Sequence, residues 1–165
     1  ACRRRRSMAR EQASPSRNLT CMEISLGQTA TVVRHVAETD TAQAVGSGDL
    51  AVLATPILLA WLEAATVAVC GSTDTQTTVG TRVAVDHLRP SAVGAEISCT
   101  ATVAEIDDRM VTFKVEARQR HNGQDVLIGR GIITRAVVAR ERFLAKLDRR
   151  ATDRSLREGT QSPGQ

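Results

Sequence analysis

The chain has 165 residues, of which 42% are hydrophobic and 24% charged, as expected for one ordinary globular domain. Its four cysteines, Cys2, Cys21, Cys70 and Cys99, show no C-x-x-C spacing, which argues against a disulfide scaffold or a zinc ribbon. The net charge of +4 is uneven, because residues 1–20 contribute six arginines against one glutamate, and the remainder carries −1. The chain also has only one Trp, two Phe and no Tyr, so few aromatic side chains could stack on bases. The sequence therefore predicts no nucleic-acid partner.

Composition divides the chain into three parts. We expect residues 1–21 to be a disordered basic tail, residues 22–148 to fold, and residues 149–165 to be a disordered polar tail. The arginine-rich and serine-rich start superficially suits an organelle transit peptide, but an upstream extension explains it equally well. The cysteine pattern favours a reducing compartment and a cytoplasmic location. The longest apolar run, residues 57–62, is too short to predict a membrane partner.

The first half of the folded part predicts a strand, a loop and a helix. Residues 23–36 alternate loosely and suit a strand, and a glycine-rich and serine-rich loop follows over residues 39–54. Thr55 as N-cap, followed by Pro56, predicts the start of a helix that ends before Gly71. Because this helix is apolar on nearly every side, we expect protein to cover it on several sides.

The second half reads as strands. Residues 79–88, 96–106, 110–120 and 126–138 alternate with a period of two and are rich in β-branched residues. Asp107-Asp108 and the turn at residues 121–123 have the composition of hairpin connections. We therefore predict an α+β fold in which a four-stranded antiparallel meander curves around the central helix. Residues 141–148 are expected to form a short closing helix.

Glu63 is the first residue that composition singles out. It is the only charged residue between Asp49 and Asp74, and it falls in the middle of the apolar helix. A carboxylate there is unfavourable unless it is paired or faces a pocket. It is either tolerated where the sheet leaves a wet gap, or it serves as a base or nucleophile.

Three further residues are candidates on the predicted strands. His87 shares a strand face with two valines, so it faces the helix if they do; a structural histidine at the core edge is the alternative. Gly80 marks a bulge or a place where a ligand approaches the backbone. Arg135 could hold a carboxylate or a phosphate, and its default is a solvated position on the outer face of the sheet.

The order of these features resembles a known family. LATP precedes the central helix, the helix carries a glutamate, the next strand ends in VDHLRP, and the last strand contains RAVV. This pattern is similar to that of hot-dog fold proteins, in particular the fluoroacetyl-CoA thioesterases. The resemblance implies that Thr55, Glu63 and His87 are catalytic and that Gly80 and Arg135 bind substrate.

The resemblance also implies an activity. It points to an acyl-CoA thioesterase that needs no metal or organic cofactor and forms a homodimer with active sites near the interface. Glu63 would be general base or nucleophile, Thr55 would orient it, and His87 would position water or the thioester. Two alternatives stay open, a non-catalytic acyl-CoA-binding domain and a hot-dog enoyl-CoA hydratase. The acyl group also stays open, because it depends on the loop at residues 41–53.

Overall fold

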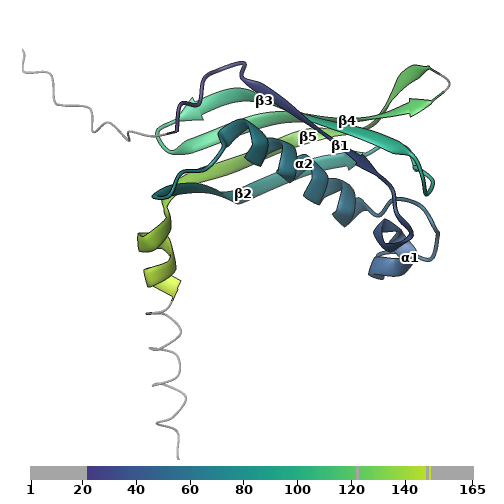
Figure 1. Ribbon diagram of the computed structural model, residues 1–165, viewed down its shortest axis with the longest axis horizontal. Helices are drawn as coiled ribbons and strands as arrows, with labels where there is room; N and C mark the ends of the chain where they lie inside the picture. The colour runs from purple at the N-terminus through teal and green to yellow at the C-terminus, as the bar shows by residue number, and fades with distance from the viewer. Residues whose placement is uncertain (1–21, 122, 148, 150–165) are drawn as a thin grey trace, which may run out of the picture.

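The computed structural model describes residues 22–121, 123–147 and 149. In this part of the chain, five strands form one antiparallel sheet in the order β1-β3-β4-β5-β2, and one long helix lies against a face of it (Figure 1). Both predicted tails lie outside the described residues, except for Arg149 in the second tail. Asp148, the predicted last residue of the folded part, also lies outside them. The strands are β1 (Thr29–His35), β2 (Gln76–His87), β3 (Glu96–Asp107), β4 (Met110–His121) and β5 (Gln124–Ala139). The helices before the second strand are η1 (Glu38–Asp40), α1 (Ala42–Val45) and α2 (Thr55–Cys70).

The predicted four-stranded meander is wrong in one respect. Strands β3, β4 and β5 are consecutive neighbours joined by the two predicted hairpins. Strand β2 does not pair with β3 but with β5, at one edge of the sheet, and β1 pairs with β3 at the other edge. The connection at residues 88–95 is longer than a hairpin turn, so nothing local forces β2 and β3 to pair. As a result β2 is an edge strand.

Two predicted segments before the long helix also differ from the structure. The first strand begins at Thr29 rather than at residue 23. The predicted loop at residues 39–54 includes most of η1 and all of α1. The Thr41 hydroxyl caps α1 by accepting a hydrogen bond from the backbone of Ala44, and Gly46 ends the helix with a φ of 73°. The glycine taken as a loop residue therefore has a helix-ending role.

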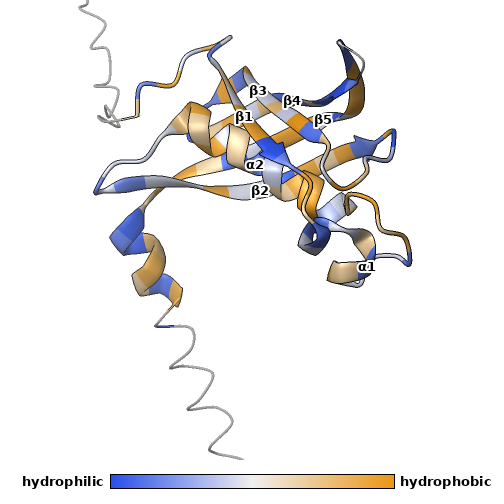
Figure 2. Cartoon of the chain, turned by 45° about the vertical axis from the view of Figure 1, so that its right-hand side comes forward, coloured by the Kyte–Doolittle hydropathy of each residue, from blue (hydrophilic) through white to orange (hydrophobic). Residues whose placement is uncertain are grey.

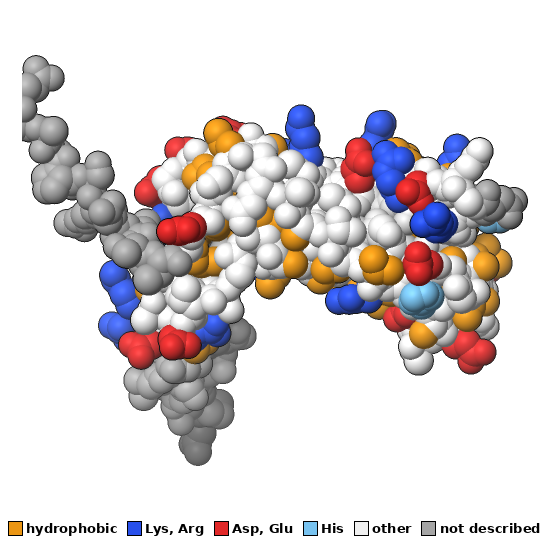
Figure 3. All heavy atoms as spheres, turned by 45° about the horizontal axis from the view of Figure 1, so that its top comes forward, with side chains coloured by type: hydrophobic (Ala, Val, Ile, Leu, Met, Phe, Trp, Pro, Cys, Tyr) orange, Lys and Arg blue, Asp and Glu red, His pale blue; other side chains and the backbone are white. Residues whose placement is uncertain are grey.

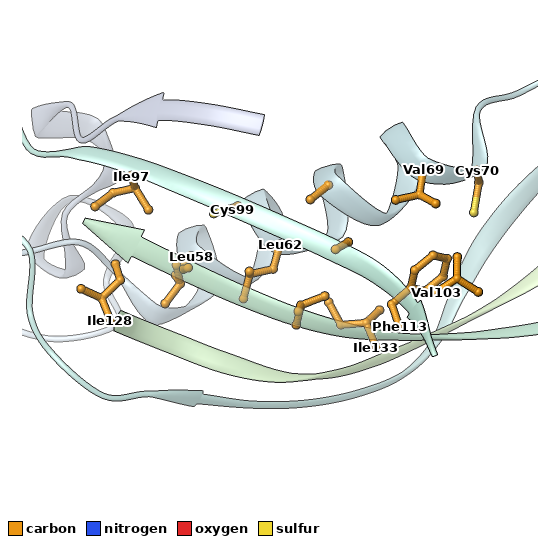
Figure 4. Packing of buried hydrophobic residues seen from close by; sticks show 14 of the residues in the cluster. Leu58, Leu62, Val69, Cys70, Ile97, Cys99, Val103, Phe113, Ile128 and Ile133 are labelled. Atoms are coloured by element: carbon orange, nitrogen blue, oxygen red, sulfur yellow. The ribbon is translucent and has the colours of Figure 1, made fainter. Parts of the chain in front are cut away.

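The core lies between α2 and the inner face of the sheet (Figure 4). Leu58 and Leu62 are both 0% exposed and point from the helix toward the strands. Alternate residues of the central strands meet them, which is the pattern of a sheet with one covered face. These inward residues are Ile97, Cys99, Ala101 and Val103 on β3, and Val111, Phe113, Val115 and Ala117 on β4.

One face of α2 remains uncovered by the described residues, so protein covers this helix on fewer sides than the sequence predicted. Val67 is 43% exposed, and Ala60 and Ala68 are also exposed. Figure 2 shows that much of α2 is nonetheless hydrophobic. A single sheet can cover only one side of a helix, so an apolar face is left open.

The end of the described chain is helical, as predicted, over residues 140–147. This helix leaves the sheet, and Figure 1 shows it projecting away from the domain. Phe143, Leu144 and Leu147 are exposed on it. No helix among the described residues is long and apolar enough to cross a membrane.

Candidate active site

Thr55 lies where α2 begins, but it is not the N-cap that the sequence predicted. The N-cap is Ala54, with extended φ and ψ of −71° and 140°, so helical dihedral angles begin at Thr55 itself. The Thr55 hydroxyl makes no cap and instead shares a hydrogen bond of 3.0 Å with Nδ1 of His87. This side chain is therefore available to the site rather than used by the helix.

His87 ends β2 and faces the helix, as its strand position predicted. Its other ring nitrogen, Nε2, is buried and has no hydrogen-bond partner among the described residues. Burial lowers the pKa of His87, and a backbone hydrogen bond at Arg89 opposes that effect in part. A neutral ring with one unpartnered nitrogen can donate to or accept from a bound water or substrate atom.

A pocket of about 280 Å³ lies beside this pair. Its wall combines the start of α2 and the end of β2 with the segment at residues 41–53. In addition to Thr55 and His87, the lining residues are Ala42, Ser47, Val52, Leu53, Leu88, Arg89 and Pro90. The segment that the sequence analysis connected with pocket size thus contributes directly to the pocket.

Glu63 lies in the middle of α2 and is paired. Its side chain is 36% exposed, and its Oε1 lies 3.5 Å from Nη1 of Arg135, whose side chain is 8% exposed. Arg135 consequently points inward, and the default expectation of a solvated arginine on the outer face is wrong. The alternative expectation was that Arg135 holds a carboxylate, and the carboxylate that it holds is that of Glu63.

Gly80 lies at a bulge, one of the two features predicted for it, and the predicted approach of a ligand stays a prediction. The pairing of β2 with β5 shifts register between Gly80 and Arg82, and Gly80 itself pairs with Arg135. A Cβ at Gly80 would lie 2.7 Å from Oε1 of Glu63, closer than real Cβ contacts come. The group that approaches the backbone here is the glutamate carboxylate.

Within one chain, these residues form two separate clusters and not a single site. Thr55 and His87 meet at one place, while Glu63, Gly80 and Arg135 meet at another. Eight residues of helix separate Thr55 from Glu63, a rise of about 12 Å. Along β2, Gly80 and His87 are roughly 20 Å apart. A single copy therefore does not bring His87 to Glu63.

Two members of the second cluster, Thr66 and Thr78, were not predicted from the sequence, and both accept a hydrogen bond from Arg135. Thr66 follows Glu63 by three residues on the helix, and Thr78 precedes Gly80 by two on the strand. Those spacings place each threonine on the same face as its neighbour, so the signal was present but not distinctive. Among the residues that the structure describes, no group of three or more His, Cys, Asp or Glu side chains could hold a metal ion.

A curved antiparallel sheet with one long helix against its face is the hot-dog fold, and comparison with solved structures agrees. The fluoroacetyl-CoA thioesterase FlK superposes with a TM-score of 0.67 at 25% identity, over 76% of this chain and 96% of that one. A thioesterase superfamily member from Thermus thermophilus gives 0.70 at 22% identity, over 79% and 95%. A hot-dog-like protein from Thermanaerovibrio acidaminovorans gives 0.68 at 20% identity, over 77% and 93%.

The family follows from the sequence itself. Residues 36–141 match the model of the fluoroacetyl-CoA-specific thioesterase family. The chain belongs to this family and is a thioester hydrolase of the acyl-CoA thioesterase type. No curated protein sequence gives a significant match. The predicted hot-dog fold is confirmed.

Proposed function

We propose that this protein hydrolyses an acyl-CoA to free acid and CoA, with Glu63 as general base or nucleophile and with Thr55 and His87 as its partners. The observation that carries the proposal is the state of Glu63. It is the only carboxylate on α2, it is partly exposed, and a buried arginine holds it. A fixed carboxylate that a substrate can still reach suits either role.

Both chemical routes give the same products. As a base, Glu63 would take a proton from a water that attacks the thioester carbonyl. As a nucleophile, it would attack the carbonyl itself, expel the CoA thiolate and form an anhydride that water then hydrolyses. The unpartnered Nε2 of His87, with Thr55 behind it, would hold the carbonyl or the attacking water.

The two remaining site residues would meet the substrate at the glutamate. Gly80 has no side chain, which would leave space for the thioester oxygen beside the backbone. Arg135 would contribute positive charge near the carboxylate, and any contact that it makes with the thioester would use the second hydrogen of Nη2, since the first is donated to Thr78. The acyl group would occupy the pocket of about 280 Å³ beside Thr55 and His87.

We also propose that the protein acts as a homodimer and that each active site is shared between two copies. β2 is an edge strand, and Val83 on it is 41% exposed. The stretch from Gly80 to His87 has its midpoint between Val83 and Ala84. Two copies of β2 paired antiparallel about that point would place Gly80 of one opposite His87 of the other.

Such a pairing would join the two clusters that one chain keeps apart. Glu63 of one copy would approach Thr55 and His87 of the second copy. The pairing would also protect the open edge of β2 and bring a second chain near the uncovered apolar face of α2, two features that favour association.

A cytoplasmic location is part of the same proposal. Both cysteines that the structure describes, Cys70 and Cys99, are buried free thiols. Burial raises the pKa of Cys99 to about 12, which makes this thiol unreactive at neutral pH. Free thiols in the core suit a reducing compartment.

The test is release of free thiol from a panel of short, branched, aromatic and long acyl-CoAs, by the wild type and by Glu63→Gln. We expect turnover of at least one member, and a loss of about 10²-fold or more in the variant, because an amide can neither take the proton nor attack. The variant should keep the circular dichroism spectrum of the wild type. Full activity of a folded Glu63→Gln protein contradicts the assignment. Saturable binding without thiol release points to the binding-domain alternative.

A further inference from the structure

The guanidinium of Arg135 is bound almost entirely by the protein itself. Nε donates to the Thr78 hydroxyl at 2.9 Å, and Nη2 donates to the Thr78 carbonyl at 3.0 Å. Nη1 donates to the Thr66 hydroxyl at 3.4 Å and faces Oε1 of Glu63 at 3.5 Å. All three nitrogens therefore have partners within the chain, which is not the arrangement of an arginine that waits for a ligand.

Thr66 links this arginine to Glu63 by a second route. Its hydroxyl donates to the Glu63 carbonyl at 2.6 Å and accepts from Arg135. Arg135 thus contacts Glu63 at the carboxylate directly and at the backbone through one threonine. Thr66 is 0% exposed, so no water competes for these bonds.

Thr78 anchors the arginine to the strand that also carries Gly80. The planar guanidinium is held at two adjacent positions by one residue, the Thr78 hydroxyl and carbonyl, which fixes its plane as well as its position. Gly80, two residues further along β2, leaves room for the carboxylate. The strand thereby sets both where Arg135 lies and how close Glu63 comes.

We infer that Arg135, held by Thr66 and Thr78, is a positioning residue that fixes the Glu63 carboxylate, and that its main role is not to bind substrate. The inference rests on the proposed function of Glu63. A glutamate side chain has three rotatable bonds and would otherwise sample many positions on a half-open helix face. Small displacements of a catalytic group lower the rate of the chemical step far more than they lower substrate binding.

The experiment compares two substitutions at Thr78 in the full chain. Thr78→Val keeps the shape of the side chain but removes the acceptor for Nε of Arg135, while Thr78→Ser keeps the hydroxyl. With the best acyl-CoA of the panel, we expect kcat to fall about 10-fold or more in the valine variant, with KM within about twofold, because the carboxylate shifts while the substrate contacts remain. The serine variant should retain most of the wild-type kcat.

The same comparison at Thr66 guards against a folding artefact. Thr66→Val removes only the weaker 3.4 Å contact and the link to the Glu63 carbonyl, and Thr66→Ser restores both. Thermal unfolding of all four variants shows which are folded, and the folded valine variants decide the test.

Three outcomes overturn the inference. They are an unchanged kcat in the folded valine variants, a raised KM at constant kcat, and serine variants as slow as the valine ones. A raised KM would mean that Arg135 binds substrate. Failure of the proposed function looks different, because then the wild type itself releases no thiol from any acyl-CoA or Glu63→Gln remains fully active.

Discussion

Gly80 allows the Glu63 carboxylate to lie closer to β2 than any side chain at that position would permit. In Gly80→Ala, the added methyl would meet Oε1 of Glu63 at 2.7 Å. The carboxylate is the flexible partner, so we expect it to move away while the fold persists. We predict that kcat for thiol release falls about 10-fold or more.

A double variant separates this effect from general damage to the strand. In a Glu63→Gln background, Gly80→Ala should lower the residual rate little further, because the group that it displaces has already lost its function. If the two losses multiply instead, the glycine acts on the rate by another route.

His87 gives a prediction about pH. Burial lowers its pKa in the folded protein, whereas in the unfolded chain it keeps a pKa of about 6.5. As the pH falls through about 6.5, the unfolded chain therefore takes up the proton first and is stabilised. The stability that depends on a neutral His87 is thus fully present above that pH and is lost as the pH falls toward the folded-state pKa.

Urea unfolding at about pH 7.5 and about pH 5.5 tests this effect. The wild type should lose more free energy of unfolding between the two values than His87→Asn, which has no ring to protonate. Equal losses would show that another group is responsible, since all other titrating side chains are common to both proteins.

At the scale of elements, α2 is the centre of the core. Leu62 on this helix is 0% exposed, so Leu62→Ala should lower the free energy of unfolding by about 2–5 kcal/mol through the cavity that it leaves. Leu50 is 63% exposed, and Leu50→Ala is a matched control that should change stability by about 0.5 kcal/mol or less. Similar losses in both variants would mean that α2 is not packed as described.

The elements that local sequence determines were predictable. The long helix, the two hairpins and the strands from β3 to β5 depend on periodicity, on turn residues and on Gly71 after the helix. The position of β2 beside β5 could not be predicted, because pairing between strands far apart in the sequence leaves no local pattern. The predicted N-cap, Thr55, is one residue too late, because the extended backbone angles of Ala54 make that residue the N-cap.

The catalytic roles of the candidate site residues stay a prediction, and their arrangement could not be predicted from the sequence. Resemblance to a family indicated Thr55, Glu63 and His87, yet the sequence placed them in one group. The inward direction of Arg135 depends on the register between β2 and β5, which pairs it with Gly80. The separation of His87 from Glu63 follows from the same register and from the direction of α2, and neither can be read from residue types.

At the scale of the whole molecule, a shared active site makes a quantitative prediction. We expect Glu63→Gln and His87→Ala each to be nearly inactive alone. If each site takes its glutamate from one copy and its histidine from the other, a mixed dimer holds one intact site. Random exchange of equal amounts should then restore about a quarter of wild-type activity.

The exchange experiment needs a control for slow subunit exchange. The two variants are mixed in urea, refolded together, and compared with each variant refolded alone. Light scattering measures whether the refolded protein is dimeric. A dimeric mixture that stays inactive contradicts the shared site, because sites built from one chain cannot repair one another.

Two isolated bridges hold the segment at residues 41–53. Thr41 pairs with Leu53 at its two ends, and Val52 pairs with Ala92 in the connection between β2 and β3. The segment lines the pocket that we assign to the acyl group, and it contributes none of the residues that hold Glu63. The segment that would meet the acyl group is therefore separate from the residues that hold Glu63. Substitutions in this segment can change the shape of the pocket without removing any contact that holds Glu63, so the choice of acyl group and the position of the carboxylate can be altered independently.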